Sequence, residues 1–142
     1  MPHHSIAAAI AGSLCEVLVF EDNRVDAMLL ESALDFAPIN VTFCSDGRQA
    51  WNLVNVIEPP DLVLLNISLP HINGLELLKH IKSKRPWRKV PVVVISGENR
   101  VNKIKAIIEL GVHDFIHKPY DVRRLRNDLE RLLNCLSGPV HA

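Results

Sequence analysis

Five short apolar runs alternate with longer amphipathic segments along this chain of 142 residues, and this alternation restricts the fold more than any other feature. The runs are rich in Val, Ile, Leu and Phe, and they cover residues 16–20 (EVLVF), 40–44 (NVTFC), 61–65 (DLVLL), 91–95 (PVVVI) and 113–117 (HDFIH). Several are apolar at every position, as in parallel strands that are covered on both faces. Strand and helix alternating five times predict a three-layer α/β sandwich with right-handed crossovers.

The segments between the runs carry apolar residues at helical spacing, with charged residues on the opposite side. We expect five such stripes to pack in the core: Val25, Met28, Leu29, Ser32, Ala33 and Phe36; Ala50, Leu53, Val54 and Ile57; Leu75, Leu78 and Ile81; Val101, Ile104 and Ile108; Val122, Leu125, Leu129, Leu132 and Leu136. Asp22 or Asn23 is placed to cap the first helix, and Asp46 the second. Trp51 and Trp87 lie off the stripes, so they are candidate exposed contacts for a partner.

The length of the chain suits one domain. We expect residues 15–137 to form it, with a flexible N-terminal arm at residues 1–14 and a tail at residues 138–142. The arm has a short apolar run but no positively charged leader, which disfavours a signal peptide or a membrane span. Sixteen basic residues balance sixteen acidic ones. This balance indicates neither nucleic acid nor a membrane surface as the main partner.

The three cysteines, Cys15, Cys44 and Cys135, show no metal-binding spacing. We expect Cys15 and Cys44 at opposite ends of neighbouring parallel strands, roughly 13 Å apart, which is too far for a disulfide. Free thiols fit a reducing cytoplasm best.

Polar residues follow four of the five predicted strands. Glu21 and Asp22 follow the first, Asn66 the third, Ser96 the fourth and Lys118 the fifth. The carboxyl ends of parallel strands share one edge of the sheet, where ligands bind in open α/β folds. A carboxylate pair suits a hard cation such as Mg²⁺, and a lysine with a hydroxyl suits the oxygens of a phosphoryl group.

These residues lie in motifs that resemble the receiver family of response regulators, including its single-domain chemotaxis-type members. The matching stretches are VLVFEDN at the first strand, DLVLLNISLPHINGLELL around the third, VVVISGEN at the fourth and DFIHKPY at the fifth. The resemblance extends from about residue 16 to residue 136. It implies a flavodoxin-like fold, a doubly wound parallel sheet of five strands in the order 2-1-3-4-5.

The resemblance also implies roles for single residues. Glu21 and Asp22 match the acidic pair that holds Mg²⁺, and Ser68 matches the position whose backbone carbonyl joins them. Lys118 matches the lysine that contacts the phosphoryl oxygens, and the bond to Pro119 is cis in the family.

Three further matches concern the switch and the loop after the third strand. Ser96 matches the hydroxyl that turns toward the phosphoryl group on activation. Phe115 matches the aromatic residue that moves with this hydroxyl, and without a phenol it signals through packing alone. Gly74 matches the glycine that closes the loop after the third strand.

Asn66 departs from the family pattern at the position of the phosphoacceptor aspartate. A carboxylate attacks phosphorus as an anionic nucleophile, whereas the carboxamide nitrogen has a delocalised lone pair and its oxygen is neutral. We therefore expect no aspartyl phosphate and weakened Mg²⁺ binding. We also expect the Asn66 amide to donate hydrogen bonds to Glu21 and Asp22 while its oxygen accepts one from Lys118. The sequence leaves open a natural pseudo-receiver and an engineered Asp-to-Asn change.

The resemblance implies a signalling module rather than an enzyme, with a sensor histidine kinase or a histidine phosphotransfer protein as partner. In the family, the fourth helix, fifth strand and fifth helix often form a homodimer or output surface, which makes Arg100, Lys103 and Lys105 candidate contacts. Two alternatives stay open on the same architecture. An aspartyl-type phosphatase or phosphotransferase needs a nucleophilic Asp where Asn66 stands, and a flavin-binding domain needs a phosphate loop where the acidic EDNRVD lies.

Overall fold

The computed structural model describes residues 15–35, 39–68 and 73–137. For residues 134–137 it describes the backbone alone. The flexible arm at residues 1–14 and the tail at residues 138–142, both expected from the sequence, lie outside this part of the chain.

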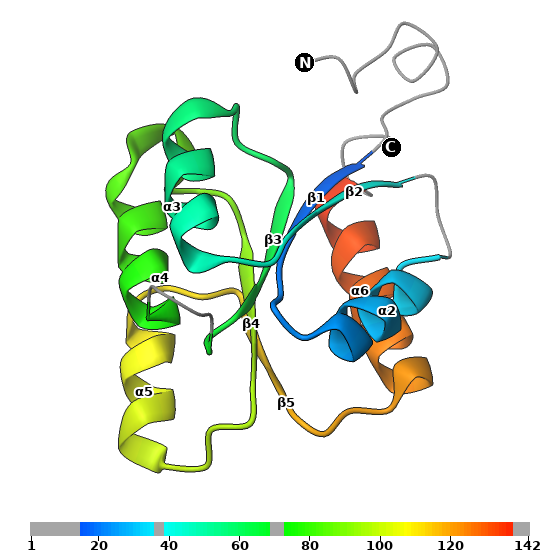
Figure 1. The fold of residues 1–142 in the computed structure, drawn as a ribbon. Helices are drawn as coiled ribbons and strands as arrows, with labels where there is room; N and C mark the ends of the chain where they lie inside the picture. Colours follow the sequence, from blue (N-terminus) through cyan, green and yellow to red (C-terminus); the bar gives the residue numbers. More distant parts are fainter. Residues whose placement is uncertain (1–14, 36–38, 69–72, 138–142) are drawn as a thin grey trace, which may run out of the picture.

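Strands and helices alternate as the apolar pattern predicts (Figure 1). The strands are β1 (Cys15–Phe20), β2 (Ile39–Cys44), β3 (Leu62–Asn66), β4 (Val92–Ser96) and β5 (Asp114–His117). The helices are α2 (Arg24–Ala33), α3 (Gly47–Val56), α4 (Gly74–Ser83), α5 (Val101–Glu109) and α6 (Val122–Ser137), with a 3₁₀ turn η1 (Arg85–Trp87) before β4. Asn23 caps α2 and Asp46 caps α3, as expected.

The five strands form one parallel sheet in the order β2-β1-β3-β4-β5, so the predicted fold class is confirmed. Helices α2 and α6 cover one face, and α3, α4 and α5 cover the other (Figure 1). Alternate residues of the central strands enter the two cores: Leu64 packs toward α2 and α6, and Leu65 packs toward the other three helices. This two-sided burial explains why the strand sequences are continuously apolar.

Two predicted helical stripes have the wrong phase. Val25 and Met28 of α2 are 64% and 63% exposed, whereas Leu30 and Ala33 are buried. Met28 lies about 200° around the helix from Leu30, because each residue turns the helix by about 100°. The whole stripe therefore cannot face the sheet. Phe36 of the same stripe lies outside the described residues.

The stripe predicted for α5 is likewise wrong, because Val101 and Ile108 are exposed and Ile107 is the residue that enters the core. Trp87, expected at the surface, is 2% exposed and packs in the core on the side of α3, α4 and α5. Trp51 is half-buried and stacks on His80 of α4, with the ring centroids 3.6 Å apart.

The cysteine prediction is confirmed where it is described. Cys15 pairs with Ile39 at one end of β1 and β2, Cys44 pairs with Phe20 at the other end, and both are free thiols. Within the described residues, no helix is long and apolar enough to cross a membrane.

Candidate functional site

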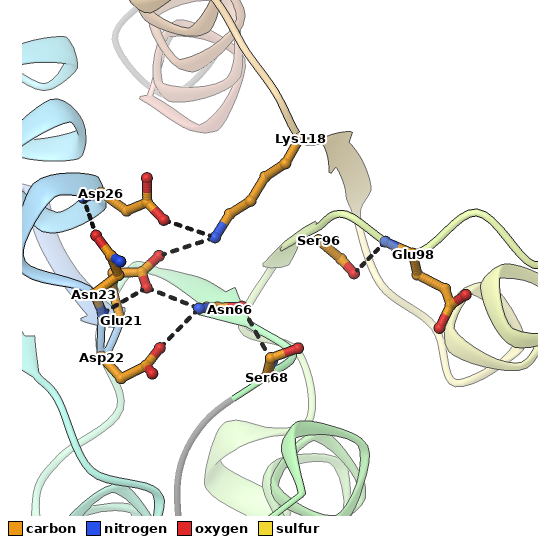
Figure 2. A network of polar contacts seen from close by, with 9 residues as sticks. All are labelled: Glu21, Asp22, Asn23, Asp26, Asn66, Ser68, Ser96, Glu98 and Lys118. Atoms are coloured by element: carbon orange, nitrogen blue, oxygen red, sulfur yellow. Dashed lines mark hydrogen bonds and ion pairs between the residues drawn. The ribbon is translucent and has the colours of Figure 1, made fainter.

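The carboxyl ends of the strands bring the predicted polar residues to one rim of the sheet (Figure 2). Glu21 follows β1 directly, Asn66 ends β3, Ser96 ends β4 and Lys118 follows β5. Asn66 and Ser96 are the last residues of their strands rather than the first residues after them. The ladder bonds of the sheet therefore hold both in place.

Asn66 is the centre of the polar network. Its Nδ2 donates to Glu21 Oε2 at 2.7 Å and to Asp22 Oδ1 at 3.0 Å, as predicted. Its Oδ1 accepts from the backbone N–H of Ser68 at 3.0 Å. These partners fix the orientation of the amide, since two carboxylates require a donor and an N–H group requires an acceptor.

The predicted contact between Lys118 and Asn66 is wrong. Lys118 Nζ instead donates to Asp26 Oδ2 at 3.0 Å and lies 3.7 Å from Glu21 Oε1. The physical reason is charge: an ammonium prefers a carboxylate to a neutral amide oxygen, and that oxygen already accepts from Ser68. Asp26, in the first turn of α2, is the site residue that sequence reasoning missed.

Glu21 is the buried acid of this site, with 2% of its surface exposed. Burial raises the pKa of its carboxyl, while hydrogen bonds from Asn23 and Asn66 and the charge of Lys118 act in the opposite direction. Its Oε1 makes no hydrogen bond within the described part of the chain. A buried carboxylate oxygen without a hydrogen bond can bind a cation or a proton.

Ser96 is buried, and its Oγ accepts from the backbone N–H of Glu98 at 3.0 Å. A cavity opens beside it, between the loops after β3 and β4, and Ser68 lines the other side of this cavity. His117 of β5 contacts the same loop after β4, with Nε2 2.9 Å from the carbonyl oxygen of Glu98. Phe115 is half-buried and packs against the core on the side of α3, α4 and α5.

The loop after β3 closes tightly at Gly74. The Gly74 N–H donates to the carbonyl oxygen of Ile67 at 3.0 Å, and a Cβ atom at Gly74 would lie 2.1 Å from that oxygen. Glycine is therefore required by close approach of the backbone. The bond between Lys118 and Pro119 is cis, as the resemblance implied.

The carboxylate oxygens at this edge of the sheet are the type of ligand that Mg²⁺ prefers, but too few of them are free to bind it. Glu21 and Asp22 offer the hard carboxylate oxygens that this cation prefers. Glu21 Oε2 and Asp22 Oδ1, however, both accept from Asn66 Nδ2, so an NH₂ group stands where the two carboxylates converge. Among the residues of known placement, no three Asp, Glu, His or Cys side chains form a metal-binding group.

Comparisons with known proteins identify the family of this chain. Residues 17–130 match the response regulator receiver domain family. The two-component response regulator ARR3 of Arabidopsis thaliana is 33% identical over 81% of this chain, and ORR11 of rice (Oryza sativa subsp. indica) is 32% identical over 83%. This chain spans 55% of the length of ARR3 and 84% of the length of ORR11.

Solved structures match over most of the chain. The phosphorylated cyanobacterial phytochrome response regulator RcpA has a TM-score of 0.78 at 27% identity, covering 89% of this chain and 96% of its own. The receiver domain of the sensor histidine kinase PA1611 of Pseudomonas aeruginosa has a TM-score of 0.74 at 25% identity, covering 89% of this chain and 99% of its own. That domain holds a magnesium ion in its active-site cleft.

Proposed function

Because this chain belongs to the response regulator receiver domain family, we propose that it is a signalling module of a two-component system in which Asn66 occupies the phosphoacceptor position. Receiver domains are generally phosphorylated by histidine kinases or phosphotransfer proteins, and such a protein is the proposed partner here. One observation carries the proposal. Asn66 ends β3 at the point where Glu21 and Asp22 converge, which is where a family member places its acceptor carboxylate.

The chemistry of Asn66 blocks the covalent step. Phosphoryl transfer to a receiver needs an anionic oxygen that attacks phosphorus and forms an acyl phosphate. The amide nitrogen of Asn66 is engaged with both carboxylates through its hydrogens, and its lone pair is delocalised into the carbonyl. Its neutral oxygen accepts from Ser68. The domain therefore signals through its fold and its contacts rather than through an aspartyl phosphate.

Mg²⁺ binding is weakened but not abolished in this proposal. Glu21, Asp22 and the backbone carbonyl of Ser68 would hold the cation, which supplies charge neutralisation for phosphoryl oxygens when bound. Before it binds, the hydrogen bonds from Asn66 to both carboxylates must break. A third carboxylate is also missing, so the net attraction for a divalent cation is smaller.

The output surface of the proposal lies on α5, β5 and α6, the fourth helix, fifth strand and fifth helix of the chain. Val101 and Ile108 are large apolar side chains on the exposed side of α5, and Lys103 and Lys105 lie beside them in sequence. Exposed apolar groups with a charged surround are typical of protein contacts. A homodimer or an output partner is the proposed occupant, and the cytoplasm the proposed location. Ser96 and Phe115 would couple the rim to this surface.

The test is covalent modification. The protein and its Asn66→Asp variant are incubated with acetyl phosphate and Mg²⁺, and their intact masses are measured. Phosphate on the variant alone supports an intact pocket that lacks its acceptor. Phosphate on neither protein points to a site that has lost the chemistry altogether, and phosphate on both refutes the proposal. Asn52→Asp, the same exchange on the exposed side of α3, is the matched control.

A further inference from the structure

Lys118 has a carboxylate partner that the sequence motifs do not assign. Its ammonium donates to Asp26 Oδ2 at 3.0 Å rather than to Asn66 (Figure 2). The two side chains are 23% and 27% exposed. Water therefore screens this ion pair only in part, and its geometry is close enough for a charge-assisted hydrogen bond.

Lys118 pairs with Asp26 because Asp26 offers the nearer of the two carboxylate oxygens beside the ammonium. Asn66 Oδ1 is neutral and accepts from Ser68. Glu21 uses Oε2 for Asn23 and Asn66, and its Oε1 lies farther from Lys118, at 3.7 Å. Asp26 carries a full charge and stands at the shorter distance.

The backbone of Asp26 is part of the N-terminal cap of α2. It lies in the first turn of α2, and its backbone N–H donates to the capping side chain of Asn23 at 2.9 Å. A negative charge in the first helical turn is also favoured by the helix dipole. The helix therefore sets the backbone position from which the Asp26 carboxylate reaches Lys118.

The ion pair joins α2 to the segment between β5 and α6. A second contact joins α2 to α6 itself, since an Arg126 guanidinium nitrogen donates to the carbonyl oxygen of Ser32 at 2.8 Å. Tyr120 packs against the core below, and its pKa is raised to about 12 by burial first and then by the charges of Asp26 and Glu21. The segment after Lys118 therefore contacts α2 through Arg126, and its Tyr120 lies close enough to Asp26 to be affected by the charge of that carboxylate.

We propose that Asp26 is a positioning residue that serves as the built-in counter-anion of Lys118, holding this ammonium toward α2 and away from Asn66. The inference rests on the proposed function, in which no phosphoryl group forms at Asn66 to attract the lysine. Asp26 supplies the negative charge that would otherwise come from such a group. An aspartate placed at position 66 then supports only slow phosphotransfer, because Asp26 still competes for Lys118.

The first test follows the Lys118 ammonium by NMR in the chain that keeps Asn66. We expect slowly exchanging NH₃⁺ protons from an ammonium held in an ion pair, and their loss in Asp26→Asn. Asp22→Asn is the matched control, because Asp22 bonds to Asn66 and not to Lys118. The proposal is overturned if the signal survives Asp26→Asn, or if Asp22→Asn removes it equally.

The second test measures the rate of phosphorylation by acetyl phosphate in the Asn66→Asp background. Adding Asp26→Asn should raise the rate about fivefold, the factor that one modest ion pair gives. Asp26→Glu should return the slow rate, and Glu31→Gln, on the exposed side of α2, should leave it unchanged. A purely structural Asp26 would lower the unfolding midpoint without raising the rate, which would overturn the proposal.

The two tests also separate the inference from its premise. If Asn66→Asp takes up no phosphate at all, the site has lost the phosphotransfer chemistry altogether, and if the parent protein takes up phosphate as well, the proposed function fails. The NMR comparison still decides whether Asp26 holds Lys118, since it does not depend on phosphoryl transfer.

Discussion

Replacing Asn66 by aspartate should destabilise the metal-free domain, although the two side chains have nearly the same shape. Asn66 is 6% exposed, and its Nδ2 lies 2.7 Å from Glu21 Oε2 and 3.0 Å from Asp22 Oδ1. The substitution removes both donors and places a third carboxylate against the other two. Glu21 is even more buried than Asn66, at 2% exposed, so water relieves little of the repulsion.

The magnitude follows from these contacts. Each hydrogen bond to a charged acceptor contributes about 1.5–3 kcal/mol. Two unit charges about 3 Å apart repel by about 5 kcal/mol at an effective dielectric constant of about 20. Attraction by Lys118 and movement of the exposed Asp22 offset most of this sum. We therefore expect a net loss of about 3 kcal/mol in the free energy of unfolding, which is a large share of the stability of a small domain.

Urea unfolding followed by circular dichroism, in EDTA and in excess Mg²⁺, measures this loss. At a slope of about 1–3 kcal/mol per molar urea, the midpoint of Asn66→Asp in EDTA should fall by about 1–3 M. Mg²⁺ should restore the variant and affect the parent protein much less, because a cation binds a carboxylate triad more tightly. The reasoning is refuted if the variant is as stable as the parent in EDTA, or if Mg²⁺ stabilises both equally.

Three other predictions use the same unfolding assay. Trp87→Ala should cost about 3–5 kcal/mol because the ring is 2% exposed in the core, whereas Trp51→Ala, at a half-buried stack, should cost about 1–2 kcal/mol. An equal loss would contradict this contrast. Gly74→Ala should lower stability by about 1–3 kcal/mol, since a Cβ would meet the Ile67 carbonyl at 2.1 Å; a gain, as helix propensity alone predicts, would show that the backbone yields. Burial first, and then Lys84, lower the pKa of His80 in the folded state, so stability should fall as pH drops from the unfolded value of about 6.5 through the lower folded value. In His80→Gln this part of the pH dependence should vanish, and its persistence would assign it to another group.

The sequence by itself determined the architecture and the rim. Continuous apolar runs alternating with helical stripes require strands covered on both faces, and parallel strands place their carboxyl ends at one edge. Glu21, Asp22, Asn66 and Lys118 were therefore expected together, and the two hydrogen bonds from Asn66 to the acids follow from its amide chemistry. These expectations succeed because they depend on local periodicity and strand direction, and both can be read from residues that are neighbours in the sequence.

Only the tertiary structure decided which apolar residues enter the core and which acid holds the lysine. Met28 is as apolar as Leu30, but the angle at which α2 meets the sheet buries one and exposes the other. Trp87 is buried because it lies in the short turn η1, whose side-chain directions cannot be read from helical or strand periodicity. Lys118 and Asp26 are 92 residues apart in sequence, and their pairing depends on side-chain reach, burial and competing hydrogen bonds that exist only once the chain has folded.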